Sequence, residues 1–161
     1  MTHQDGILQI LFRILSANEE AVRAFLRGNP FDKLLRSYSE FTADGKGLYK
    51  SDRAFQHCRM SSKAQQEYES GKRMKDLYQE HRVPLSIIRD RLLKSDRTLD
   101  AINHIMQDNE IVIITRQEQQ YLDNATENGG LGLKSTMPKN GQCRLVYAGI
   151  QLEAKPQSPP C

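Results

Sequence analysis

The segment NEIVIITRQE, residues 109–118, decides the fold because it places the strongest strand signal of the chain directly before a helix start. The four β-branched residues at 111–114 are typical of a buried strand. Thr115 and Glu118 then form a T-x-x-E capping box, in which each side chain bonds the backbone N–H of the other residue. We therefore expect a strand over 110–115 and a helix from Arg116 to about Asn124.

The regions on either side predict two more strands in a mostly helical chain. Pro84 favours an extended backbone at Val83, so we expect a strand over 77–83. The apolar run after Arg144 predicts a late strand over 144–149. The remaining signals are helical: an apolar run at 7–15, which is also compatible with a strand, a polar and largely solvated helix over 51–70, and amphipathic segments at 86–93 and 98–107. The expected fold class is α+β, mostly helical with a small hairpin or sheet.

A length of 161 residues fits one domain, because a second core would leave each half little apolar area to bury. We therefore expect a single domain over residues 1–152 and a flexible tail over 153–161. Within this domain we expect a helical N-terminal part at 5–78, a ββα core at 77–124 and the C-terminal strand at 144–150.

The composition is that of an ordinary globular protein, with 38% hydrophobic and 27% charged residues. No run approaches the roughly 18 apolar residues that span a bilayer, and the N-terminus lacks the basic region and cleavage site of a secretory signal. We therefore expect a cytoplasmic protein without a membrane partner. The three cysteines are too few and too scattered for a disulfide framework or a zinc knuckle. The apolar N-terminal helix is a candidate surface for a protein partner or for homo-oligomers.

Four polar residues follow one another in an order that suggests chemistry. Glu80 and His81 stand side by side before Val-Pro, Asn109 directly precedes the 110–115 strand, and Glu118 lies in the first turn of the next helix. This order resembles the motif of the HNH, or His-Me finger, nucleases in a degenerate form that covers about residues 80–124. In that family a metal ligand stands nine positions after the Asn, which is the spacing of Asn109 and Glu118.

The resemblance implies a metal-dependent endonuclease that hydrolyses phosphodiester bonds in DNA or RNA, of a phage, mobile-element or defence type. His81 would be the general base, Asn109 would brace its loop, and Glu80 and Glu118 would hold Mg²⁺ or Mn²⁺, since oxygen ligands suit hard cations. The chain departs from the family pattern in three ways. Its last ligand is Glu rather than His, paired zinc-binding cysteines are absent, and a long helical stretch separates His81 from Asn109.

Each of these residues also has a purely structural interpretation. Asn109 is a turn residue after Asp108, and the capping box competes with a metal for the oxygens of Glu118. The alternative function is a non-catalytic nucleic-acid-binding, regulatory or protein-interaction module. A formal net charge of +3 is too small to identify a nucleic-acid binder by itself, so the local clustering of cations matters more. The candidate phosphate-binding residues, for either function, are Lys72, Arg73, Lys75, Arg82, Arg89 and Arg116.

Overall fold

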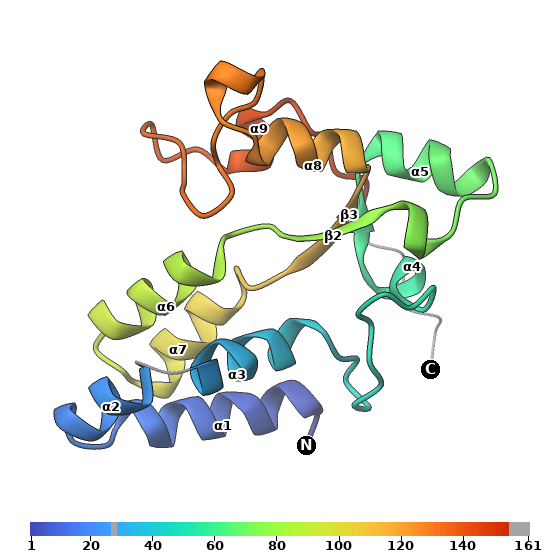
Figure 1. Ribbon diagram of the computed structural model, residues 1–161. Coiled ribbons are helices and arrows are strands. Elements are labelled where there is room, and N and C mark those ends of the chain that lie inside the picture. The colour runs from blue at the N-terminus through green and yellow to red at the C-terminus, as the bar shows by residue number, and fades with distance from the viewer. Residues whose placement is uncertain (27–28, 155–161) are drawn as a thin grey trace. The chain divides into compact units, whose positions relative to one another are not determined.

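The computed structural model describes residues 1–26 and 29–154, which form two compact units (Figure 1). The helical unit combines Met1–Gly47 with Leu85–Glu110, and the sheet unit combines Leu48–Pro84 with Ile111–Cys161. Helices accompany a small mixed sheet, so the expected α+β fold class is confirmed. The single domain over 1–152 stays a prediction.

The helical unit is held together by the apolar faces of its helices. Helix α1 begins with a capping box between Thr2 and Asp5, and its buried residues Ile7, Leu11 and Leu15 recur at helical spacing. It packs against α3 and α7, which confirms a helix for the apolar N-terminal run. In the described part of the chain no helix is long and apolar enough to cross a membrane. The helices of this unit are α1 (His3–Leu15), α2 (Glu19–Leu26), α3 (Asn29–Ser39), α6 (Leu85–Lys94) and α7 (Leu99–Met106).

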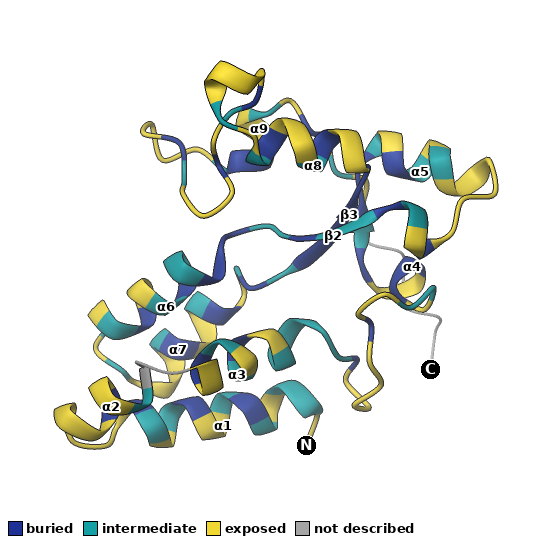
Figure 2. Cartoon of the chain, in the orientation of Figure 1, coloured by how far each residue is buried: buried dark blue, intermediate teal, exposed yellow. Residues whose placement is uncertain are grey.

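The sheet unit is built around strand β3 (Ile111–Ile114), which is buried over its whole length (Figure 2). The strand order is β1-β3-β2, with β1 (Arg59–Met60) parallel to β3 and β2 (Tyr78–His81) antiparallel to it. The predicted strands near 77–83 and 110–115 are therefore confirmed. The helices of this unit are α4 (Ala54–His57), α5 (Ser62–Glu69), α8 (Arg116–Asp123) and α9 (Arg144–Tyr147), with the 3-10 turns η1 (Met74–Asp76) and η2 (Thr126–Asn128).

The pleat of β3 gives the sheet unit two core clusters. Ile111 and Ile113 belong to a cluster with residues of α4, α5 and η1, whereas Val112 and Ile114 belong to a cluster with residues of α8 and α9. Successive side chains of a strand point to opposite faces, so the two clusters lie on opposite faces of the sheet. This alternation also governs the neighbouring strand β2, which carries two of the candidate site residues.

The prediction of a strand over 144–149 is wrong, because this segment forms helix α9. The backbone N–H groups of Tyr147 and Ala148 donate to the carbonyls of Cys143 and Arg144, and Gly149 follows with φ 71°. Tyr147 is 51% exposed. A run of four apolar residues has too little length for its period to separate a strand from a helix, and a glycine at positive φ is a common helix end.

The prediction of one solvated helix over 51–70 is also wrong. The segment divides into α4, strand β1 and α5, and Phe55, Cys58 and Met60 are buried. Strand β1 exists because it pairs with β3, with Arg59 opposite Val112. A contact between positions so far apart in the chain leaves no local signal, so the helix-forming composition was misleading.

The predicted flexible tail over 153–161 stays a prediction, although its first residue is hydrogen-bonded to the end of β1. The Glu153 N–H donates to the Met60 carbonyl at 2.8 Å, and Leu152 forms an isolated bridge with Ser61. This segment therefore extends the hydrogen bonding beyond β1. Residues 155–161 of the predicted tail lie outside the described residues.

Candidate functional site

Glu80 and His81 are neighbours in the chain but not in space. They occupy successive positions of β2, Glu80 opposite Val112 and His81 opposite Ile111, and these two partners belong to different core clusters. Because side chains alternate along a strand, the carboxylate and the imidazole point to opposite faces of the sheet. The Glu-His pair of the predicted nuclease motif therefore does not converge on one point.

The carboxylate of Glu80 forms a buried ion pair with Arg144 of α9. The side chain of Arg144 has no exposed surface, and that of Glu80 is 11% exposed. Burial raises the pKa of Glu80, and the charge and hydrogen bond of Arg144 offset part of this increase, while nearby Asp123 adds to it. Protein donors therefore already hold the carboxylate that was expected to bind a metal.

Arg144 is the central polar residue of the sheet unit, and the sequence analysis missed it. Its guanidinium donates to the carbonyls of His81, at the end of β2, and of the following Arg82. It also donates to the carbonyls of Leu133 and Lys134, with the Leu133 contact at 2.9 Å. One arginine thus joins β2, the 131–134 segment and α9. Its only sequence signal is a charged residue directly before an apolar run.

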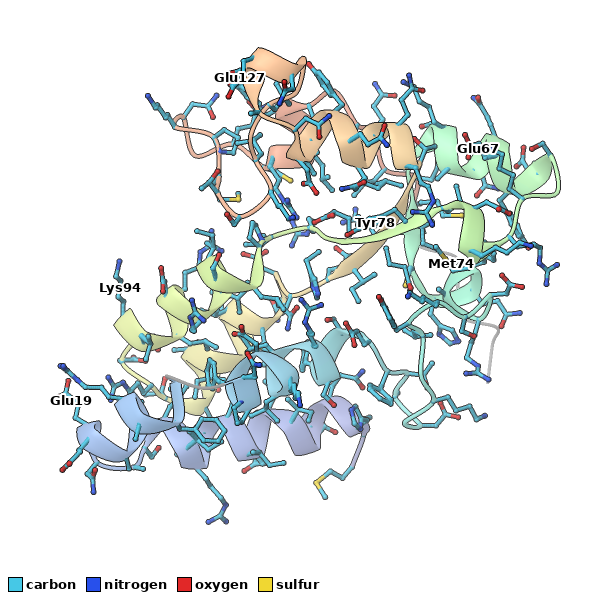
Figure 3. All side chains as sticks on the ribbon, viewed as in Figure 1. Glu19, Glu67, Met74, Tyr78, Lys94 and Glu127 are labelled. Atoms are coloured by element: carbon cyan, nitrogen blue, oxygen red, sulfur yellow. The ribbon has the colours of Figure 1, made fainter. Side chains whose placement is uncertain are left out.

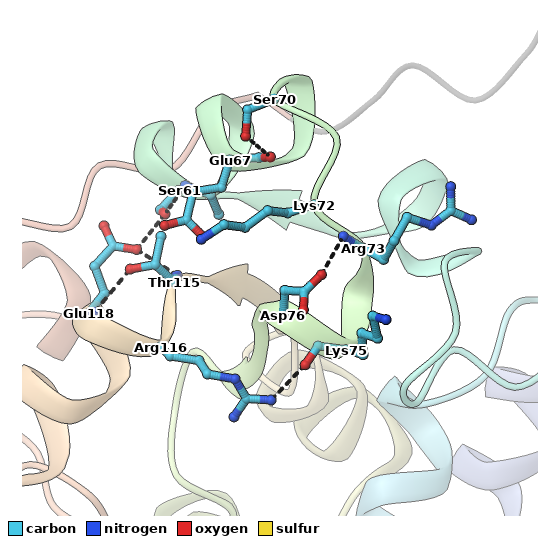
Figure 4. A network of polar contacts seen from close by, with 11 residues as sticks. Ser61, Glu67, Ser70, Lys72, Arg73, Lys75, Asp76, Thr115, Arg116 and Glu118 are labelled. Atoms are coloured by element: carbon cyan, nitrogen blue, oxygen red, sulfur yellow. Dashed lines mark hydrogen bonds and ion pairs between the residues drawn. The ribbon is translucent and has the colours of Figure 1, made fainter.

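Glu118 caps helix α8, as its structural interpretation expected. Its Oε2 accepts from the Thr115 N–H at 2.9 Å, which completes the predicted capping box. The same oxygen accepts from the buried hydroxyl of Ser61 at 2.6 Å (Figure 4). The sequence analysis did not identify Ser61. A cation at Glu118 would have to compete with both donors.

Asn109 lies in the helical unit, whereas the other three motif residues lie in the sheet unit. It is 3% exposed, and its Nδ2 donates to the Leu35 carbonyl of α3 at 2.7 Å. This bond links two distant parts of the helical unit, which is a structural role. Within residues 1–26 and 29–154, no group of three or more His, Cys, Asp or Glu side chains is arranged to hold a metal ion.

Four of the predicted phosphate-binding residues come together in the sheet unit (Figure 4). We call this group, Lys72, Arg73, Lys75 and Arg116, the basic edge. Lys72 and Arg73 directly precede η1 and Lys75 lies within it, while Arg116 opens α8 and donates to the Lys75 carbonyl at 2.8 Å. All four residues are exposed. Two separate segments of the chain thus place exposed cations at and around η1, where Arg116 contacts the Lys75 carbonyl.

The two remaining predicted cations do not join the basic edge. Arg82 is half-buried after β2, where its carbonyl accepts from Arg144. Arg89 lies in the helical unit and pairs with Asp32 at 3.4 Å. Figure 3 shows all described side chains and labels Met74 of η1, which lies between Arg73 and Lys75 of the basic edge in the chain. The basic edge is therefore a feature of the sheet unit.

The net charge of the chain also resides in the sheet unit. Lys and Arg outnumber Asp and Glu in its two segments, whereas acidic residues are in slight excess in the helical unit. Comparison with protein-family models, with curated proteins and with solved structures found no match for this chain.

Proposed function

We propose that the chain is a nucleic-acid-binding module that contacts phosphate groups through the basic edge and does not cut its ligand. The observation that carries this proposal is the meeting of four exposed cations from two chain segments in the sheet unit. Lys and Arg side chains that neutralise phosphates release counterions, and this release drives much of the binding to nucleic acid.

The carboxylates that pair with the basic edge would compete only weakly with a phosphate for its cations. Lys72 pairs with Glu67 at 3.1 Å, and their side chains are 48% and 33% exposed. Arg73 pairs with Asp52, and its side chain is 65% exposed. Exposed ion pairs of this kind contribute about 0–1 kcal/mol, so their cations can exchange a carboxylate for a phosphate at little cost.

The test is the salt dependence of binding to labelled DNA and RNA oligonucleotides, followed by fluorescence anisotropy. We expect the affinity to fall steeply with salt, and the double substitution Lys72→Ala/Lys75→Ala to reduce the slope by about one for each phosphate that is no longer neutralised. Lys94→Ala, at an exposed lysine of the helical unit, is the matched control. Affinity that does not change with salt, or an equal loss in the control, would refute the proposal.

Hydrolysis of nucleic acid is the second candidate. The observation in its favour is the antiparallel pair β2 and β3 followed directly by α8, which is the ββα order that the HNH resemblance implies. The contacts of Glu80 and Glu118 with protein donors oppose it. We would incubate the protein with plasmid and RNA in Mg²⁺ or Mn²⁺ and compare it with His81→Ala. Absence of cleavage in both metals would remove this candidate.

A further inference from the structure

Two exposed tyrosines lie in segments that contact the basic edge. Tyr49 precedes α4 and is 56% exposed, and Tyr68 lies in α5 and is 40% exposed. Both belong to the sheet unit. Aromatic rings at the surface beside cations are the side chains on which nucleic-acid bases stack.

Tyr49 is held by an ordered turn rather than by packing of its own ring. The side chain of Gln79, from β2, donates to the Leu48 carbonyl at 3.0 Å and accepts from the Lys50 N–H at 2.6 Å. These two bonds fix the backbone on both sides of Tyr49. The Lys50 Nζ lies 5.1 Å from the centroid of the Tyr49 ring, so a positive charge accompanies the ring.

Tyr68 rests on Phe55, with 4.2 Å between the ring centroids and 31° between the ring planes. Phe55 itself is buried in the core cluster that includes Ile111 and Ile113. A ring supported in this way loses little conformational freedom when a base stacks on its exposed surface.

Acidic side chains near the two tyrosines contact the basic edge. The carboxylate of Asp52, three residues after Tyr49, binds the guanidinium of Arg73 and accepts from the Met74 N–H at 2.9 Å. Glu67, the neighbour of Tyr68, pairs with Lys72. Lys72 and Arg73 of the basic edge therefore contact the segments that carry the two rings.

We infer that this surface binds single-stranded nucleic acid, with the basic edge on the phosphates and Tyr49 and Tyr68 stacked on unpaired bases. This inference rests on the proposed function. The bases of a duplex are stacked on one another and offer no free face to a ring, whereas a single strand does. An acidic peptide would match the cations, but its carboxylate side chains offer no aromatic ring to the tyrosines.

The test compares a single strand of about 12 nucleotides, within the usual range of site sizes, with its duplex, using the full chain. We expect Tyr49→Ala and Tyr68→Leu each to weaken single-strand binding by roughly 5- to 150-fold and to leave duplex binding unchanged. Tyr49→Phe and Tyr68→Phe keep the ring and should retain the affinity. Tyr147→Ala, at a tyrosine of α9 that is 51% exposed, is the matched control.

The outcomes separate this inference from the proposed function. If both tyrosine variants bind the single strand as the unmodified chain does, while Lys72→Ala/Lys75→Ala is weakened, the stacking inference fails and the proposed function stands. If the lysine variant is unaffected, or if polyglutamate competes as well as the oligonucleotide, both fail. Circular dichroism of Tyr68→Phe and Tyr68→Leu checks that any loss of binding does not come from unfolding at the Phe55 contact.

Discussion

The two units of the molecule differ in the burial of their charged side chains. In the helical unit the ion pair of Arg91 with Asp108 lies at the surface, with side chains 42% and 40% exposed. In the sheet unit the ion pair of Arg144 with Glu80 is buried, and the Ser61 hydroxyl that binds Glu118 has no exposed surface. Among the described residues, the buried charged side chains therefore lie in the sheet unit, whereas the polar side chains buried in the helical unit, Thr42 and Asn109, are uncharged.

The difference has its origin in backbone hydrogen bonding. A helix satisfies most of its carbonyls within the element, so helices can pack mainly through apolar faces, with an uncharged bond such as that of Asn109 to the Leu35 carbonyl between them. The sheet unit has short strands and irregular segments, and the carbonyls of Arg82, Leu133 and Lys134 receive hydrogen bonds from Arg144. A buried arginine is stable there because these acceptors and Glu80 satisfy its donors. This difference between the units predicts which substitutions will lower the free energy of unfolding most.

The largest effect is expected for Arg144→Ala. Removing one partner of a buried ion pair leaves the other charge uncompensated, so the free energy of unfolding should fall by about 3–5 kcal/mol. Denaturant unfolding measures the loss, and amide hydrogen exchange should place it in β2 and β3 rather than in α1. Arg144→Met combined with Glu80→Leu should recover part of the stability, since no buried charge remains. A loss below about 1 kcal/mol, within the range of exposed ion pairs, would contradict the comparison.

Ser61→Ala should have the next largest effect, about 2–3 kcal/mol. The substitution removes a hydrogen bond to a buried carboxylate and the hydroxyl that caps α5 through the Ala64 N–H. Ser62→Ala is the control, because the Ser62 hydroxyl binds an exposed carboxylate, that of Glu153, and its loss should change stability by less than about 0.5 kcal/mol. Thermal unfolding of the two variants measures the difference, and equal losses would show that burial of the hydroxyl is unimportant.

The change in stability with pH that is due to Glu80 should be smaller than the effect of Ser61→Ala. Burial raises the pKa of Glu80 above the ordinary value of 4.5, so the folded chain holds this proton more tightly than the unfolded chain. Its contribution to stability is complete below 4.5 and decreases as pH rises through the folded pKa. Glu80→Gln lacks this titration, so the stability of the unmodified chain relative to the variant should fall over the pH interval that begins near 4.5 and ends above the raised pKa of Glu80. A rise over that interval would show that the Arg144 charge dominates.

Asp108→Ala should have the smallest effect. Its ion pair with Arg91 is exposed, so we expect a loss of about 0–1 kcal/mol that decreases further as salt rises. Denaturant unfolding at low and high salt measures both quantities. A loss as large as that of Ser61→Ala would mean that the helical unit also depends on its ion pairs, and the contrast between the units would fail.

The candidate site illustrates what spacing along the chain cannot predict. Adjacent residues suggested that Glu80 and His81 act together, but the strand pleat separates them. The spacing of Glu118 satisfied both a metal motif and a capping box, and the structure confirms the cap. Its second partner, Ser61, is 57 positions away in the chain, and no local pattern records such a contact.

The sequence by itself determined the elements whose signals are local: the β-branched strand at 111–114, the capping box at Thr115, the apolar face of α1 and the α+β class. These depend on backbone preferences and on periodicity within one element. Only the tertiary structure decided strand β1 and the burial of Arg144, because both depend on partners distant in the chain. Helix α9 was also left to the structure, because its apolar run is too short for the period to separate a helix from a strand. The energy of a buried hydrogen bond or strand pairing exists only once folding brings both partners together.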